Sequence, residues 1–147
     1  MLTRRQVLEG TALLAGLGLP LRSSASPAAD AAIEVLTKGA PVTRGRVTLG
    51  MPPIAENGFS VFTTIQAESP MTEADYVKSI HLFSEKNPIA RMASFYFTPA
   101  IAQAKVSTNV RLAASQKITA IAVMSDGSLW SDEQNIVVTI AACIDGG

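Results

Sequence analysis

The sequence predicts one all-β domain, an antiparallel β-sandwich, from three observations. The chain has 147 residues, the usual size of a single domain, and 48% of them are hydrophobic, which is enough to build a core. About seven short segments alternate apolar with polar residues, as strands with one buried face do. Prolines separate these segments, and proline is disfavoured inside a sheet, so the segments are expected to be strands joined by short connections.

The elements follow in order along the chain. A short helix is expected over residues 31–37, stopped by Gly39 and Pro41. Strands are then expected over residues 46–49, 59–67, 77–83, 93–98, 105–112, 117–124 and 135–141. The alternation places seven side chains inside the sandwich: Ala93, Phe95, Phe97, Val106, Val110, Leu112 and Ile118. Asn57-Gly58 and Asp126-Gly127 suit tight turns with positive φ, either as hairpins or as other turns between strands.

Residues 1–29 are typical of a cleaved export signal. Arg4 and Arg5 precede an apolar run over residues 11–21, which is too short, too rich in glycine and too broken by Pro20 to span a membrane. The stretch over residues 3–8 is similar to a twin-arginine signal, and a general secretory signal with a chance arginine pair is the alternative. Both predict export to the periplasm. Possible cleavage points are the small residues Ser23, Ala25, Ala28 and Ala29.

Charge and composition exclude several classes of function. Twelve basic and twelve acidic side chains give a formal net charge of +0, which argues against a nucleic-acid-binding protein. No membrane association is expected for the mature chain. One Cys and one His are too few for an intrachain disulfide or a Cys/His zinc site, so we expect no metal and no cofactor.

Cys143 lies four residues before the end of the sequence, beyond the last expected strand. We divide the mature chain into a sandwich domain, residues 30–140, and a mobile arm, residues 141–147. The arm surrounds the thiol with Ala141, Ala142, Ile144, Asp145, Gly146 and Gly147. Terminal glycines leave the backbone free, which favours an exposed thiol. The alternative is a small buried Cys that completes the last strand.

No residue near Cys143 in the sequence supplies a base for the thiol. Activation would therefore have to come from a partner's active site, and we expect the chain not to be an enzyme. His81 lies in an expected strand, where it is interpreted as a hydrogen-bonded or exposed structural residue. Glu73 and Asp75 follow Thr72, which suits the cap of a helical turn, and are interpreted as structural too.

Several short motifs, taken together in their order, resemble the SoxY family of thiosulfate-oxidation carrier subunits. They cover nearly all of the mature chain: Ala55-Glu56-Asn57-Gly58, Glu68-Ser69-Pro70-Met71-Thr72, Asp75-Tyr76-Val77-Lys78, Asn87-Pro88, Arg111-Leu112-Ala113, Ser115-Gln116 and Ser125-Asp126-Gly127-Ser128. The resemblance implies an immunoglobulin-like sandwich with a flexible C-terminal arm. It also implies that Cys143 is the covalent attachment site for sulfur intermediates.

The resemblance further implies the partners of such a carrier. These are a SoxZ-like β-sandwich subunit, which completes a heterodimer, and the periplasmic cytochrome, hydrolase and dehydrogenase components of sulfur oxidation. The family's arm ends Gly-Gly-Cys-Gly-Gly, whereas this chain has Ala141-Ala142 before the Cys and Ile144-Asp145 after it. These departures add bulk and a negative charge beside a thiol expected to receive anionic thiosulfate.

Two other classes compete with the carrier. The first is an exported binding or structural sandwich without covalent cargo, in which Cys143 is buried or forms an intermolecular disulfide. The second is a thiol peroxidase or reductase, which is disfavoured because it needs a nearby base or a resolving Cys. Titration of the thiol in the native protein separates the first class from the carrier.

Overall fold

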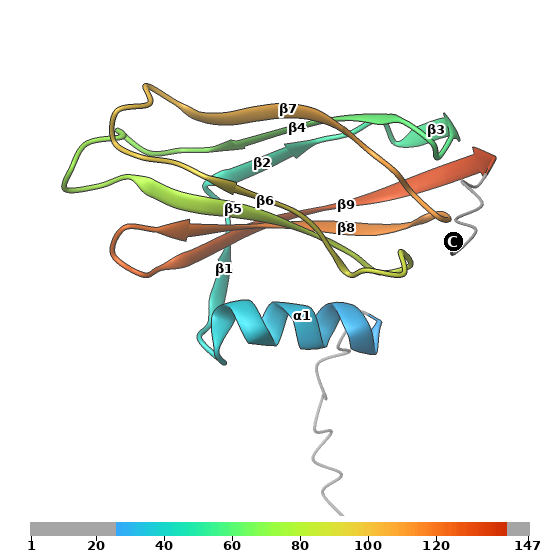
Figure 1. Cartoon of the computed structure of the whole chain (residues 1–147), viewed down its shortest axis with the longest axis horizontal. Coiled ribbons are helices and arrows are strands. Elements are labelled where there is room, and N and C mark those ends of the chain that lie inside the picture. Colours follow the sequence, from blue (N-terminus) through green and yellow to red (C-terminus); the bar gives the residue numbers. More distant parts are fainter. Residues whose placement is uncertain (1–25, 141–147) are drawn as a thin grey trace, which may run out of the picture.

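The computed structural model describes residues 26–140, which form one helix and nine strands (Figure 1). In chain order these are α1 (Pro27–Thr37), β1 (Val42–Arg44), β2 (Val47–Gly50), β3 (Ile54–Asn57), β4 (Val61–Ala67), β5 (Val77–Ser84), β6 (Arg91–Tyr96), β7 (Ala104–Val110), β8 (Gln116–Met124) and β9 (Leu129–Ile140). The export signal predicted over residues 1–29 lies almost entirely outside the described residues, as does the arm predicted over residues 141–147.

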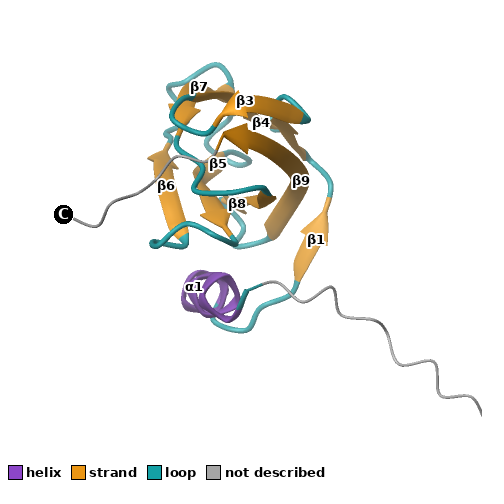
Figure 2. Cartoon of the chain, turned by 90° about the vertical axis from the view of Figure 1, so that its right-hand side faces the viewer, coloured by secondary structure: helices purple, strands orange, loops and turns teal. Residues whose placement is uncertain are grey.

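Two sheets pack face to face, which confirms the predicted sandwich. The larger sheet has the order β1-β9-β8-β5-β6, with β3 also paired to β9, and the smaller sheet has the order β2-β4-β7 (Figures 1 and 2). Aliphatic side chains of both sheets meet in one core, with Leu49 and Ile65 from the smaller sheet and Ile80, Leu82 and Ile118 from the larger. Because the two apolar faces cover each other, the alternating strands can keep their other faces polar.

The seven side chains predicted to point inward do so. Val110, Leu112 and Ile118 are buried. The other four are half-buried and pack against the same core: Ala93, Phe95, Phe97 and Val106. Their partial exposure has a common cause, because all four belong to or adjoin β6 and β7, which are the last strands of their sheets.

β9 differs from the prediction in its length and its partners. It begins at Leu129, six residues before the expected start, because polar side chains in its first half make it look like a loop in the sequence. Two of those side chains hold other elements, since Asp132 accepts a hydrogen bond from the backbone of Leu49 at 2.9 Å and Glu133 pairs with Lys117 at 3.5 Å. β9 also has two parallel neighbours, β1 and β3, in a fold expected to be wholly antiparallel.

The two expected turns have different outcomes. Asp126-Gly127 closes the hairpin between β8 and β9, where Gly127 has φ 85° and donates its N–H to the Met124 carbonyl at 3.0 Å. Asn57-Gly58 forms no hairpin, because β3 pairs with β9 and not with the following strand. Neither Asn57 nor Gly58 has positive φ, so that part of the expectation was wrong.

Helix α1 begins four residues earlier than predicted, at Pro27, and ends as predicted at Thr37. Proline suits the first turn of a helix, and Lys38 and Gly39 stop the helix in the left-handed region, with φ 54° and 79°. The helix covers the outer face of the larger sheet, where Ile33 and Leu36 pack on Phe83 and its neighbours (Figure 1). Of the helices within residues 26–140, none is long and apolar enough to cross a membrane.

The position of α1 predicts where the export signal expected over residues 1–29 would be cleaved. Cleavage after Ala28 or Ala29 would cut into the first turn of the helix and remove the bond from the Asp30 N–H to the Ser26 carbonyl, and cleavage after Ala29 would also remove the buried Ala29. We therefore expect cleavage after Ser23 or Ala25, which keeps α1 whole. The intact mass of the exported protein gives the site directly, and a mature chain that starts at Ala29 or Asp30 would contradict this prediction.

Candidate functional site at the end of the last strand

Cys143 and the six other arm residues lie outside the described residues, so the expected exposure of the thiol stays a prediction. The structure does describe the strand end from which the arm continues. β9 ends at Ile140, three residues before Cys143. At ~3.3 to 3.6 Å per extended residue, three residues of chain span at most about 11 Å, which limits how far from Ile140 the Cys143 thiol can act. We call residues 137–140, the last of β9, the arm root.

The arm root is held along one edge by β3. The parallel register places Ile54 opposite Val137 and Asn57 opposite Ile140. Beyond the end of β3, the Gly58 N–H donates to the Ile140 carbonyl at 2.9 Å. The Thr139 hydroxyl donates to the Glu56 carbonyl at 2.7 Å. This edge is therefore bonded as far as the last described residue.

A single hydroxyl holds the opposite edge of the arm root. The pairing of β8 with β9 stops at Gln116 and Ile136, which leaves the next backbone groups of β9 without a strand partner. Ser115 replaces the missing strand, because its Oγ accepts the Val138 N–H at 2.8 Å and donates to the Val138 carbonyl at 3.3 Å. Both backbone groups of Val138 are thus satisfied by one side chain.

A partly buried amide network fixes the loop that carries Ser115. The Asn87 side chain donates to the Arg111 carbonyl at 2.8 Å and accepts the Ala113 N–H at 2.9 Å. Gln116 donates to the same Asn87 oxygen at 3.0 Å and accepts the Ser84 hydroxyl at 2.6 Å. The connection between β5 and β6 is thereby tied to the connection between β7 and β8. Three of the motifs that carry the family resemblance meet here, at the end where the arm begins.

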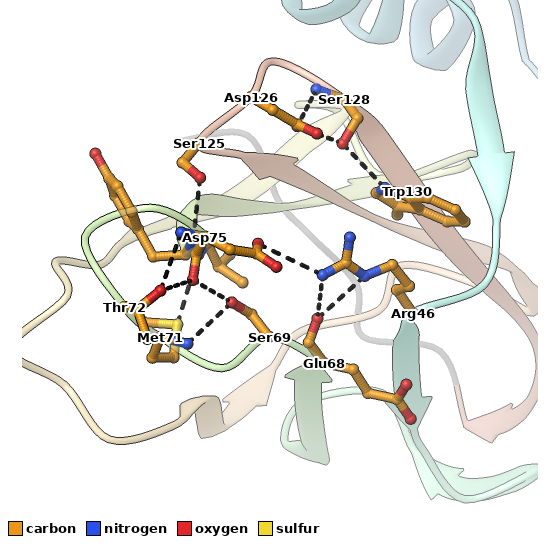
Figure 3. A network of polar contacts seen from close by, with 12 residues as sticks. Arg46, Glu68, Ser69, Met71, Thr72, Asp75, Ser125, Asp126, Ser128 and Trp130 are labelled. Atoms are coloured by element: carbon orange, nitrogen blue, oxygen red, sulfur yellow. Dashed lines mark hydrogen bonds and ion pairs between the residues drawn. The ribbon is translucent and has the colours of Figure 1, made fainter.

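Three of the other motifs meet at the opposite end of the sandwich (Figure 3), whereas the Ala55-Glu56-Asn57-Gly58 motif lies beside the arm root. Arg46 donates to the Glu68 carbonyl at 3.0 Å, pairs with Asp75 at 3.7 Å and lies 5.4 Å from the Trp130 ring. Asp126 accepts from Ser128 in the hairpin between β8 and β9, and these hydrogen bonds lower the pKa of the Asp126 carboxyl. The network joins the connection between β1 and β2, the connection between β4 and β5, and the hairpin between β8 and β9. The motif residues in it therefore have structural roles.

The acidic pair after Thr72 forms no helical turn. The Thr72 Oγ1 accepts the Asp75 N–H at 3.1 Å, as a helix cap would, but residues 73–75 are a bend that leads into β5. The Asp75 carbonyl accepts the Thr72 N–H and the Ser69 hydroxyl, and the carboxylate pairs with Arg46. The structural interpretation of Asp75 is therefore supported, whereas the expected helical turn was wrong.

His81 is a buried, hydrogen-bonded structural residue, which agrees with the first of its two interpretations and not with an exposed position. It is 3% exposed, and its Nδ1 and Nε2 lie 2.7 Å from Ser94 Oγ and 2.9 Å from Ser79 Oγ. Burial, and secondarily the charge of Arg91, lower the pKa of the imidazole from its ordinary value of 6.5. Both ring nitrogens are engaged by hydroxyls, so the ring is not placed to serve as a base. Among residues 26–140, no three His, Cys, Asp or Glu side chains are grouped to hold a metal ion.

The fold and its anchored last strand define a small immunoglobulin-like sandwich from which the C-terminal segment continues at one end. The family model described as "Sulfur oxidation protein SoxY" matches residues 33–143. The chain therefore belongs to the SoxY family, and its role lies in sulfur oxidation. No curated protein matches the sequence significantly.

Solved structures show the same fold. The sulfur carrier protein SoxY from Chlorobium limicola f. thiosulfatophilum is 25% identical, with a TM-score of 0.65 over 77% of this chain and 97% of that one. A superoxide reductase from Ignicoccus hospitalis is 21% identical, with a TM-score of 0.57 over 71% and 86% of the two chains. The Nanoarchaeum equitans superoxide reductase is 14% identical, with a TM-score of 0.54 over 65% and 99%. The likeness to the reductases concerns the fold alone.

The lowered pKa of His81 predicts a pH-dependent stability. The unfolded chain takes up a proton near pH 6.5 and the folded chain only at lower pH, so the free energy of unfolding falls as pH drops below about 6.5. Since His81 is the one histidine of the chain, His81→Gln should reduce this slope between pH 7 and 5. Urea unfolding at several pH values measures it. Equal slopes for both proteins, or an NMR titration of His81 at or above pH 6.5, would contradict the prediction.

Proposed function

We propose that the chain is a periplasmic sulfur-carrier subunit that holds thiosulfate-derived sulfur covalently on Cys143 and presents it to partner enzymes. The observation that carries this proposal is the extent of the family match, which ends at residue 143 and so includes the single Cys of the chain. The matching structure from Chlorobium limicola is itself described as a sulfur carrier protein.

The loading step is an oxidation that needs a partner. The Cys143 thiolate and thiosulfate join through a new S–S bond to give Cys143–S–S–SO₃⁻, and two electrons leave. A cytochrome component of the sulfur-oxidation system is the electron acceptor that we propose. The chain itself has one Cys, so no second thiol within it can displace the cargo by forming an intrachain disulfide.

The arm root suits a carrier because it combines a fixed origin with a short reach. The described backbone is bonded on both edges up to Val138 and on one edge up to Ile140. A fixed origin confines the thiol to a small volume and so raises its effective concentration at a docked enzyme. Exposed apolar side chains surround this origin, and they offer a contact surface for such enzymes: Ile54, Phe59, Val137 and Ile140.

The proposal includes a heterodimer with a SoxZ-like β-sandwich subunit. The cytochrome, hydrolase and dehydrogenase components would then act in turn on the cargo, while the chain catalyses no step alone. Export by the twin-arginine route would allow a folded partner without its own signal to cross with this chain. The proposed assembly involves neither nucleic acid nor a membrane.

The test of the carrier is the mass of the protein after incubation with thiosulfate and the cytochrome component of a characterised Sox system. The wild type should gain a thiosulfate-derived adduct at Cys143, and Cys143→Ser should gain none. The free energy of unfolding should change by only about 0.5 kcal/mol, because the core described above is complete without residue 143.

The neighbouring change Ile144→Ser is the matched control, since it alters the arm and keeps the thiol. It should still load. A wild type that forms no adduct under turnover conditions would end the carrier proposal and leave the exported sandwich without covalent cargo. Native thiol titration then reports whether Cys143 is buried.

The residues after Cys143 predict that thiosulfate is loaded onto the thiol more slowly than it would be with the family's Cys-Gly-Gly ending. Deleting Ile144 and Asp145 removes a bulky side chain and a carboxylate that repels anionic thiosulfate, and it restores the Cys-Gly-Gly ending of the family. We expect a higher initial rate of adduct formation, with the difference from wild type reduced by salt where charge is the cause. An Asp145→Asn variant separates the charge from the length. Equal rates for all three proteins would show that the insertion is neutral.

A further inference from the structure

One side of the sandwich has two open sheet edges. β6 ends the larger sheet and β7 ends the smaller one, and the two lie on the same side of the molecule (Figure 2). Within residues 26–140, neither strand has a second partner. The opposite side is closed, because β1 and β3 cover β9 and the Leu49 N–H of β2 donates to Asp132 of β9. We call β6, β7 and the groove between them the open side.

The open side is basic although the chain has no net charge. Residues 86–125, which include both edge strands, hold five cations and no Asp or Glu: Lys86, Arg91, Lys105, Arg111 and Lys117. Of these five, only Lys117 takes part in an ion pair among the described residues. The other four charges are therefore available to a ligand or a partner.

A groove of about 370 Å³ runs between the two edges. Arg91 and Arg111 line it together with apolar side chains such as Met92 and Val110. Aromatic rings hold the two guanidinium groups, since Arg91 lies 5.8 Å from the Phe83 ring and Arg111 lies 5.8 Å from the Phe59 ring. Cations placed in this way keep their charge available to a neighbouring molecule.

Two large apolar side chains are exposed on the open side, one at each end of β6. Ile89, which precedes β6 and lines the groove, is 74% exposed, and Tyr96 at the end of β6 is 75% exposed. Arginine and aromatic residues are enriched at the energetic centres of protein interfaces. The open side thus combines unpaired backbone groups, apolar anchors and unpaired cations, which together fit a protein partner better than a small anion.

We propose that the open side is the docking surface for the second β-sandwich subunit, the SoxZ-like partner. We further propose that the edge by which the partner docks carries Asp and Glu. This inference rests on the heterodimer of the proposed function. The partner would extend one or both sheets by adding a strand to an exposed edge, as in β-augmentation. Its carboxylates would face Lys105, Arg91 and Arg111, and the opposite charges would set both orientation and choice of partner.

Charge also excludes a second copy of this chain as the occupant. Two copies joined through the open side would place the same cations against each other, and lysine on an edge strand is a common safeguard against self-association. The docked subunit would also border the arm root. Asn87 lines the groove and binds the Arg111 carbonyl and the Ala113 N–H, and these bonds fix the loop whose Ser115 holds the arm root.

The experiment measures binding of the mature chain to a purified SoxZ subunit. Lys105→Glu reverses an exposed, unpaired charge on β7 and should weaken affinity by roughly tenfold or more. Lys38→Glu makes the same charge change beyond the end of α1 and should leave affinity within about twofold. Binding of the wild type should weaken as salt rises. Equal affinity of Lys105→Glu and wild type would overturn the docking surface.

Hydrogen exchange of the wild type gives a second test that needs no variant. In the complex, the backbone N–H groups of residues 91–96 and 104–110 should gain protection, and those of residues 47–50 should not. Protection at another surface, or self-association through the open side, would overturn the proposal. Neither measurement depends on cargo at Cys143, so a failure of docking is distinguishable from a failure of sulfur loading. If SoxZ does not bind the wild type at all, the heterodimer itself is refuted, and the docking surface with it.

Discussion

The pairing of β9 with three other strands is the constraint on which the rest of the structure depends. β8 covers one edge of β9 from residue 129 to 136, and β1 and β3 share the other edge, one at each end. Between these two short strands the chain crosses to the other sheet as β2, which ties the sheets together along one side. As a result β9 runs the length of the sandwich with its backbone groups largely satisfied, and the arm leaves from a fixed point.

The family motifs maintain this arrangement from both ends and contain no reactive group of their own. At the arm end, Asn87 and Gln116 tie two connections together, and Ser115 completes the edge of the arm root. At the other end, Arg46 takes positive φ, 55°, where its side chain reaches Trp130 and the connection that leads into β5. The motifs at the arm end thus hold the arm root, those at the other end hold three connections, and the predicted chemistry lies beyond all of them on Cys143.

Sequence patterns predicted β2, β4, β5, β6, β7 and β8 to within two residues, but missed β1, β3 and the first half of β9. Strands β4, β5 and β8 are long and apolar enough for their burial to dominate, so their bounds agree with the prediction to within two residues. β1 and β3 have three and four residues, too few to show an alternation, and both are defined by their long-range pairing with β9. The polar first half of β9 was missed for a related reason, because Asp132 and Glu133 are retained by partners distant in the sequence.

Net charge was a poor guide to the electrostatics of this molecule. Equal totals give the value of +0, but five of the twelve basic residues lie between positions 86 and 125, whereas all twelve acidic residues lie outside this segment. The topology then gathers the basic segment at the two free edges, since both β6 and β7 lie within it. A protein built in this way exerts little field at long range, where the charges cancel, and a strong one within a Debye length of ~8 to 10 Å. A partner that docks on the open side would therefore be selected by these charges at contact and attracted little by them from a distance.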